Sequence, residues 1–271
     1  MKPESKLIDS SLGYTSFVAE FYDHIIPYQE RQDVAFFVDL AKEAGGHTLE
    51  IGCGTGRILI PTALGGNEIF GIDASDQMLS LCRRNMLTKS QAVQANVRGL
   101  FVADMRSFSL PLRFDLITIP FRSFQHLITV NEQRACLTSV HQHLKPNGTF
   151  AFDIMNPALT YLTDNQYLEE FNEEPPIYMT DGRKVVRRYR ISARHYDRQF
   201  IDGEIIYYVT HPSGRVQRLV HSFPFRYTFR FEMEHLLNLC GFAVEEVFSD
   251  FDRTPFGSKY PGELIIVAKK S

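Results

Sequence analysis

The feature that most constrains this chain is a run of alternating glycines, Leu49-Glu50-Ile51-Gly52-Cys53-Gly54-Thr55-Gly56. The apolar residues before the glycines predict a buried strand with an acidic residue near its end, and Arg57-Ile58-Leu59-Ile60 predicts the start of a helix. A strand that enters a helix through such a turn brings backbone close to a ligand beneath the helix N-terminus. An ordinary strand-to-helix turn would account for one or two glycines, but not for an acidic residue followed by three glycines at alternate positions.

The spacing of the glycines argues against a dinucleotide site. That fingerprint has a third glycine three residues after the second. Arg57 stands at that position here, and the glycine is Gly56 instead. The turn therefore favours a different ligand.

Length and composition narrow the class of protein. A chain of 271 residues can bury a large core, as one domain with an insertion or as two small domains. A net charge of −3 and a pI of about 6.3 argue against a general nucleic-acid binder. The four cysteines form no C-x-x-C pair, so neither a zinc site nor a disulfide framework is indicated. Without a signal-type or membrane-spanning apolar run, we expect a cytoplasmic protein.

Strand and helix patterns alternate along most of the chain. Apolar strands are expected at residues 48–51, 68–73, 100–102, 114–119, 149–154, 244–248 and 264–268. Helical patterns occur at about 12–44, from 57, from 75 or 76, at 131–144 and at 231–239. This alternation predicts an α/β fold with a doubly wound, mostly parallel sheet covered on both faces.

The pattern changes between about residues 177 and 229, where long segments are rich in Val, Ile, Tyr and Arg. Arg187, Tyr189, Ile191 and Ala193 would share one face of a strand. We expect an antiparallel insertion, with the arginines at 183–198 on a solvated face; the alternative is a site for an anionic substrate or RNA. The predicted division is 1–156 for N-terminal helices and ligand-binding core, 157–230 for the insertion, and 231–271 for the last helix and two strands.

Several residues fall where a nucleoside ligand would need them. Asp73 ends the second strand about 20 residues beyond the glycines, where an acid accepts ribose hydroxyls; its alternative role is a helix N-cap. Met78 would pack on the base or in the core. After the third strand, Asp104 would accept from an adenine amino group and Met105 would donate its N–H, or Asp104 is a solvated loop acid. Pro120 ends the fourth strand at the same carboxyl edge.

Together these motifs resemble the class I S-adenosylmethionine (SAM) methyltransferases over about residues 17–153. The resemblance implies a seven-stranded sheet whose last strand is antiparallel and lies between the fifth and sixth. It implies that the glycine turn, with Glu50, holds the methionine part of SAM and that Tyr22 covers it, although Tyr22 is equally a core aromatic. The implied cofactor-binding residues are Tyr22, Glu50, Gly52, Cys53, Gly54, Gly56, Asp73, Ala74, Met78, Ala103, Asp104, Met105 and Pro120.

The segment Phe121-Arg122-Ser123-Phe124-Gln125-His126 is similar to one in bacterial sugar-amine N-methyltransferases and their uncharacterised relatives. In those proteins an antiparallel insertion forms part of the substrate pocket. The many arginines of this insertion depart from what a neutral amino-sugar pocket needs. His126 matches a general base or a substrate-positioning group; by spacing alone it is equally a packed loop residue.

Methyl transfer needs alignment, exclusion of water and, for some acceptors, proton removal, so no protein nucleophile is required. We expect transfer from SAM to a nitrogen or oxygen of a small molecule. The absence of an acid at 120–125 argues against a metal. The alternatives are a SAM-binding protein without transferase activity and an RNA or protein methyltransferase. We expect no nucleic-acid or membrane partner, and a monomer or homodimer.

Overall fold

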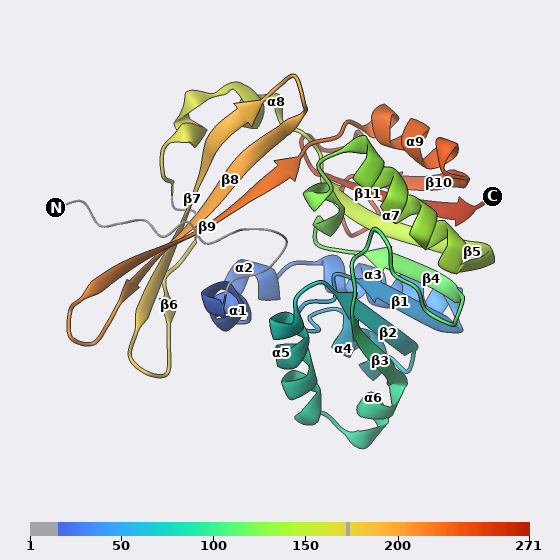
Figure 1. Cartoon of the computed structure of the whole chain (residues 1–271), viewed down its shortest axis with the longest axis horizontal. Coiled ribbons are helices and arrows are strands. Elements are labelled where there is room, and N and C mark those ends of the chain that lie inside the picture. Colours follow the sequence, from blue (N-terminus) through green and yellow to red (C-terminus); the bar gives the residue numbers. More distant parts are fainter. Residues whose placement is uncertain (1–15, 172–173) are drawn as a thin grey trace.

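The computed structural model describes residues 16–171 and 174–271, which form two β-sheets and the helices around them (Figure 1). Residues 12–15 of the first predicted helical segment lie outside this range. The strands are β1 (His47–Ile51), β2 (Glu68–Asp73), β3 (Val97–Val102), β4 (Phe114–Ile119), β5 (Leu144–Met155), β6 (Ile177–Tyr178), β7 (Lys184–His195), β8 (Phe200–Thr210), β9 (Val216–Arg226), β10 (Phe242–Phe248) and β11 (Glu263–Lys270). The helices are α1 (Ser16–Tyr22), α2 (Ile26–Gln29), α3 (Asp33–Ala44), α4 (Leu59–Leu64), α5 (Asp76–Leu87), α6 (Gln91–Asn96), α7 (Val130–His143), α8 (Leu159–Thr163) and α9 (Arg230–Leu239), with 3-10 turns η1 (Ser123–His126) and η2 (Asn165–Leu168).

The larger sheet, sheet A, has the strand order β10-β11-β5-β4-β1-β2-β3. The pairs between β1 and β2, β1 and β4, β2 and β3, and β4 and β5 are parallel. The last strand, β11, is antiparallel to both of its neighbours, β5 and β10. The predicted fold class is therefore confirmed, including the antiparallel last strand between the fifth and sixth strands of this sheet.

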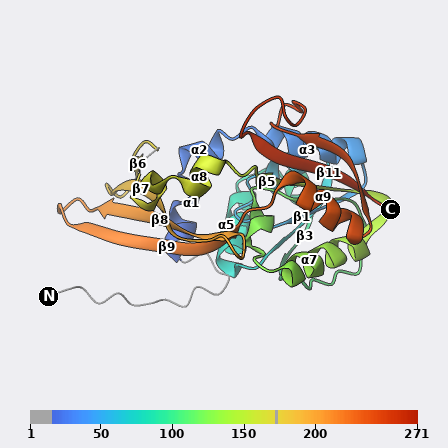
Figure 2. The ribbon, with the colours of Figure 1, turned by 90° about the horizontal axis from the view of Figure 1, so that it is seen from above.

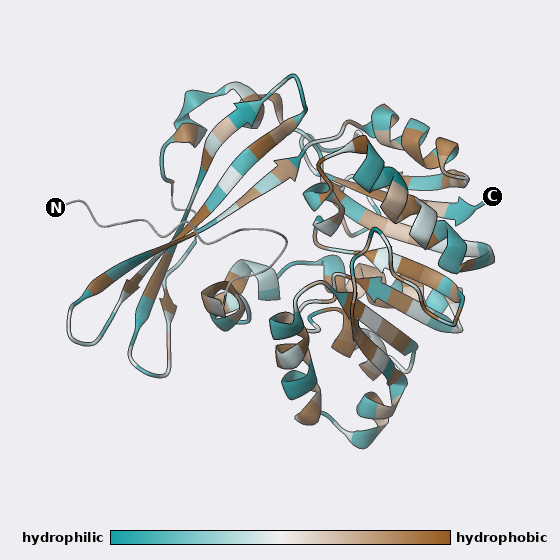
Figure 3. Ribbon diagram, viewed as in Figure 1, coloured by the Kyte–Doolittle hydropathy of each residue, from teal (hydrophilic) through white to brown (hydrophobic). Residues whose placement is uncertain are grey.

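Apolar side chains alternate between the two faces of sheet A, and helices cover both faces. On one face, strand residues pack against α3: Leu116, Ala151, Ile265 and Val267. On the other face, strand residues pack against α7 and α9: Ile117, Phe150, Phe152 and Ile266. The hydropathy colouring shows brown residues in the strands of sheet A and many teal residues on the helices around it (Figure 3). Burial of each Leu, Ile, Val or Phe side chain stabilises the folded state by about 1.5–3 kcal/mol. This core therefore holds in place the strand ends from which the glycine turn and the other site segments begin.

Helix caps set where the chain leaves the sheet edge. The Ser75 hydroxyl accepts from the backbone N–H of Met78 and begins α5, so the N-cap is Ser75. Thr129 and Glu132 form a capping box at the start of α7. Gly45, with φ +62°, follows the end of α3.

The smaller sheet, sheet B, is antiparallel with the order β6-β7-β8-β9, and it extends away from sheet A (Figure 2). Residues of α1 pack on one of its faces, in a cluster that contains Phe21, Val185 and Tyr207. The expectation that the arginines of this insertion lie on a solvated face is wrong for Arg187, which is buried. The predicted alternation also ends at Ile191, because the pairing of β7 with β8 shifts between Ile191 and Ala193.

Candidate functional site

The glycine turn joins β1 to α4 in a conformation that favours glycine. Gly52, Gly54 and Gly56 have φ values of +73°, +55° and +89°. A Cβ on Gly56 would lie 2.8 Å from the Cys82 sulfur, so a side chain would also clash there. The three alternating glycines are thus required by backbone conformation, and at the third position by packing.

A narrow cavity lies beside this turn, and its lining is Tyr22, Glu50, Gly52, Cys53, Gly54, Thr55, Arg57, Ile58, Pro120 and Phe121. Glu50 is buried, and its Oε2 atom has no hydrogen-bond partner among the residues that the structure describes. Burial raises the pKa of Glu50 well above its ordinary value, although nearby Arg57 opposes the shift. A donor group of a ligand in this cavity would satisfy the Glu50 carboxylate.

Asp73 stands at the end of β2, next to the turn. Its carboxylate accepts from the backbone N–H groups of Gly54 and Ser75, at 2.8 Å each. Burial raises the pKa of Asp73, and these two hydrogen bonds act in the opposite direction. A carboxylate has about four acceptor positions, so Asp73 keeps capacity for ligand hydroxyls. Ala74, which follows it, is exposed.

The loop after β3 runs beside Asp73, whose carbonyl accepts from the Ala103 N–H at 3.0 Å. The carboxylate of Asp104 accepts from the Arg106 guanidinium at 2.6 and 2.9 Å. The hydrogen bond from Arg106 lowers the pKa of Asp104. Met105 is partly buried against the core of sheet A. An adenine group would therefore have to share Asp104 with Arg106.

Two aromatic residues, Tyr22 and Phe121, line this cavity, and a third ring, Tyr28, packs against both. The centroid of Tyr22 lies 5.2 Å from that of Tyr28 and 6.3 Å from that of Phe121, and Tyr28 lies 4.7 Å from Phe121. Tyr22 is buried and also packs against Met78. Both residues therefore have core contacts. Tyr22 also lines the cavity, whereas Met78 is absent from that lining and borders the glycine turn, with its Cε 3.5 Å from a Cβ built on Gly54.

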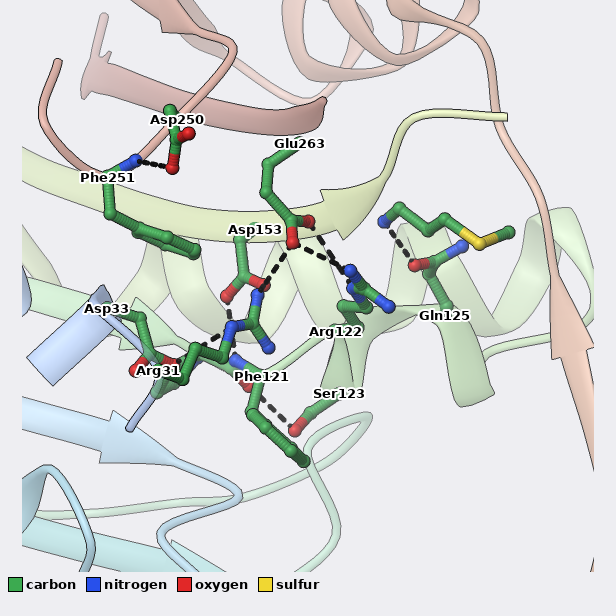
Figure 4. Close-up of polar contacts among 12 residues, drawn as sticks. Arg31, Asp33, Phe121, Arg122, Ser123, Gln125, Asp153, Asp250, Phe251 and Glu263 are labelled. Carbon is green, nitrogen blue, oxygen red and sulfur yellow. Dashed lines mark hydrogen bonds and ion pairs between the residues drawn. The ribbon is translucent and has the colours of Figure 1, made fainter. Parts of the chain in front are cut away.

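The turn after β4 has a strained backbone that buried charges hold (Figure 4). Phe121 and Arg122 both have positive φ, +59° and +61°; such residues cost about 1–3 kcal/mol each. The Phe121 N–H donates to Asp153 at 2.7 Å, and Arg31 donates to the other oxygen of Asp153 at 2.7 Å. Arg122 donates to Glu263 at 2.6 Å. Burial raises the pKa of Asp153, and Arg31 opposes that shift.

A second ion pair lies under the glycine turn. Arg57 binds the fully buried Asp33 in a bidentate pair, with both distances 2.7 Å. The guanidinium carbons of Arg57 and Arg31 lie 4.7 and 5.0 Å from the Phe121 ring centroid. Sequence reasoning missed these charged residues, although Arg57 within the glycine motif was one available signal.

His126 ends η1, after β4, and packs against β9. Its ring centroid lies 5.6 Å from Phe223 and 5.8 Å from Phe225. Burial lowers the pKa of His126, and a hydrogen bond to the Pro224 carbonyl opposes that shift. Since the nitrogen bonded to Pro224 carries the hydrogen, the other nitrogen of the neutral ring holds a lone pair.

The face of sheet B that packs on α1 holds a guanidinium among tyrosines. The guanidinium carbon of Arg187 lies 4.9, 5.1 and 5.6 Å from the ring centroids of Tyr28, Tyr189 and Tyr207. Arg187 also forms an ion pair with Glu174 and donates to the Tyr28 hydroxyl at 2.8 Å. Burial acts to lower the pKa of Arg187, but the tyrosines and Glu174 outweigh it and raise the pKa. Tyr28 thus connects the inserted sheet to the rings beside the cavity.

Within residues 16–171 and 174–271, no three His, Cys, Asp or Glu side chains gather as a metal site would require. The helices of the same part of the chain include none with the length and apolar character of a membrane span.

The core of the chain is similar to known methyltransferases. Residues 48–148 match the family model described as "Methyltransferase domain". One relative is a protein of Geobacillus sp. (strain WCH70), for which methyltransferase is a suggested activity and no acceptor is named. It is 26% identical over 96% of this chain and 100% of its own length. The dTDP-3-amino-3,6-dideoxy-alpha-D-glucopyranose N,N-dimethyltransferase of Streptomyces fradiae is 31% identical over 50% of this chain and 52% of its own.

A solved structure shares the fold over nearly the whole chain. It is a SAM-dependent methyltransferase from Clostridium acetobutylicum ATCC 824, with a TM-score of 0.73 and 18% identity. The match covers 93% of this chain and 97% of that one.

Proposed function

We propose that this chain is a SAM-dependent methyltransferase that transfers the methyl group of SAM to a nitrogen or oxygen of a small-molecule acceptor. The observation that carries the proposal is the cavity beside the glycine turn, which is lined by the Tyr22 and Phe121 rings and by Glu50, whose Oε2 atom has no hydrogen-bond partner among the described residues.

The residues around the cavity fit the chemistry of SAM. The methionine part of SAM carries an ammonium group, a donor that suits the buried Glu50 oxygen. The turn of Gly52, Cys53, Gly54 and Gly56 would face that part of the molecule. Asp73 and Ala74 would hold the ribose, and Ala103, Asp104, Met105 and Met78 the adenine. Pro120 and Tyr22 would border the sulfonium. When bound, SAM supplies a methyl group already activated for displacement.

We propose His126 as the group that receives a proton from the acceptor or orients it. It lies at the carboxyl edge of sheet A, in the segment that follows β4, as does Pro120. The lowered pKa keeps the ring neutral near pH 7, and the bond to Pro224 leaves one nitrogen able to accept a proton. An acceptor that arrives as a neutral amine needs no base for its attack, and His126 would then act by positioning.

The insertion, residues 157–230, is proposed to roof the acceptor site. Two contacts support this assignment: His126 packs against Phe223 of β9, and Arg187 of β7 bonds to Tyr28 beside the cavity. The amino-sugar acceptors of the Streptomyces relative make a small amine acceptor the first class to test.

The arginines on the opposite face of the insertion give little support to an RNA acceptor. Arg190 pairs with Glu204 at 2.6 Å, and Arg218 pairs with Glu170 at 3.0 Å. Because these charges are compensated, the surface is less attractive to a polyanion than the sequence alone suggests.

Calorimetry with SAM and S-adenosylhomocysteine tests the cofactor assignment, with NAD as the comparison ligand. We expect a Kd in the micromolar range, about −8 kcal/mol. Binding of NAD without either adenosyl ligand would refute it. Screening metabolite pools with methyl-labelled SAM then tests transfer. Cofactor binding with no labelled product from small molecules, RNA or protein would support the SAM-binding protein without transferase activity.

A further inference from the structure

The segment that carries His126 contacts the C-terminal end of β9, at the outer edge of sheet B. β9 is the last strand of that sheet, so one row of its backbone groups has no strand partner within the described residues. The Gln125 side chain donates to the Arg226 carbonyl at 2.7 Å, and His126 bonds to the Pro224 carbonyl. Residues two apart in a strand direct their carbonyls to the same side, so η1 satisfies two successive carbonyls of this edge.

The other end of the same amide reaches sheet A. The Gln125 Oε1 atom accepts from the Met155 N–H at 2.6 Å. Met155 is the last residue of β5, where the chain leaves sheet A toward the insertion. Arg226 is the last residue of β9, where the chain leaves sheet B toward α9. One side chain therefore binds both connections between the two sheets.

Burial makes these two hydrogen bonds consequential. Gln125 is 1% exposed, so water cannot replace a lost partner. Leaving a buried polar group unsatisfied costs about 1–3 kcal/mol. Arg226 strengthens the junction, because its guanidinium donates to the Ile128 carbonyl at 2.9 Å and pairs with Glu232 at 3.2 Å. Gln125 lies beside Ser123 and Arg122 at the sheet edge (Figure 4).

We propose that Gln125 is a positioning residue for methyl transfer, which fixes the inserted sheet and His126 over the cofactor site. The role rests on the proposed function, because it has a catalytic meaning only if the insertion roofs the acceptor. Gln125 is absent from the lining of the cavity beside the glycine turn, so its removal should leave cofactor binding intact.

Two substitutions separate the two bonds. Gln125→Glu keeps an acceptor for the Met155 N–H but sets an oxygen against the Arg226 carbonyl, and Gln125→Met removes both bonds at similar size. Thr149→Val is the matched control, since Thr149 is buried and accepts from Lys269 at the start of the paired part of β5. The measurements are hydrogen exchange of residues 216–226, the ring ¹⁵N shifts of His126, and calorimetry with S-adenosylhomocysteine.

For both Gln125 variants we expect amide exchange in β9 to rise about 5- to 100-fold, matching the lost hydrogen bonds. The His126 ring signals should move, while the Kd for S-adenosylhomocysteine stays within about twofold of wild type. Thr149→Val should change neither exchange in β9 nor the His126 signals. Unchanged β9 exchange and His126 signals in Gln125→Met, which can make neither hydrogen bond, would overturn the proposal, as would a parallel loss of cofactor binding. Failure of wild type to bind S-adenosylhomocysteine would instead refute the proposed function.

Discussion

Arg187 and Arg188 are consecutive residues of β7 with opposite environments. The Arg187 side chain is 1% exposed and forms an ion pair with Glu174. The Arg188 side chain is 45% exposed, and its ion pair with Glu170 is long, at 4.0 Å. Successive side chains of a strand point to opposite faces, and only the face of Arg187 is covered by α1 and Tyr28.

The two positions should therefore respond differently to the same substitution. Arg187→Met leaves Glu174 without its guanidinium in a mostly buried site, which typically costs about 3–5 kcal/mol. Arg188→Met should lower the free energy of unfolding by at most about 0.5 kcal/mol, as for other exposed pairs. Urea unfolding measures both. Losses of equal size would show that Arg187 is not the structural centre of this face.

Alanine substitutions at two glycines with nearly the same φ distinguish the cost of backbone strain from the cost of a steric clash. Gly56 and Gly66 have φ values of +89° and +90°, but a Cβ would meet Cys82 only at Gly56, and nothing lies within 4 Å at Gly66. Gly66→Ala should cost about 1 kcal/mol from the positive φ alone. Gly56→Ala should cost clearly more in thermal unfolding and should weaken S-adenosylhomocysteine binding. Similar melting temperatures for the two variants would contradict the packing role of Gly56.

Asp73 and Asp76 give a matched test of the ribose assignment. Asp73 is buried beside the glycine turn, whereas Asp76 is on the surface in the first turn of α5. Asp73→Ala should weaken S-adenosylhomocysteine binding by about 1–3 kcal/mol through lost hydrogen bonds. Asp76→Ala should leave the Kd nearly unchanged. Calorimetry on both variants decides, and equal affinities would remove Asp73 from the site.

The pH dependence of turnover tests His126. Burial lowers its pKa, so the neutral form that accepts a proton is present above a pKa lying below the ordinary 6.5. If His126 is the base, kcat/KM should rise with pH through that lowered pKa and level off above it. His126→Ala should remove this limb and lower turnover by about 10²–10⁴-fold, with cofactor affinity retained.

The same profile distinguishes the other roles of His126. A positioning group would give a smaller loss of turnover with a raised acceptor KM. An identical acidic limb and similar turnover in wild type and variant would make His126 a packed loop residue, and the catalytic assignment would be withdrawn.

Local patterns were enough to predict the core of this fold. The alternating glycines after β1, the acidic residue that ends β2 and the succession of apolar strands along the chain can be predicted from neighbouring residues, because backbone conformation and strand periodicity are local properties. The resemblance added the reversed last strand, and the pairing of β11 between β5 and β10 confirmed it. The short helix α6, which is largely polar, lacked a clear apolar period and was missed.

The charged network depended on tertiary structure alone. Arg31 meets Asp153 and Glu263 across separations of 122 and 232 residues, and no local pattern encodes such contacts. Because side chains alternate along β7, the sequence predicts that Arg187 and Arg188 lie on opposite faces of the strand. It does not predict which of these faces α1 covers. The sequence by itself determined the succession of strands and helices along the chain and the position of the ligand-binding turn. Only the packing of distant segments decided which charges are buried and how Gln125 and His126 join the two sheets.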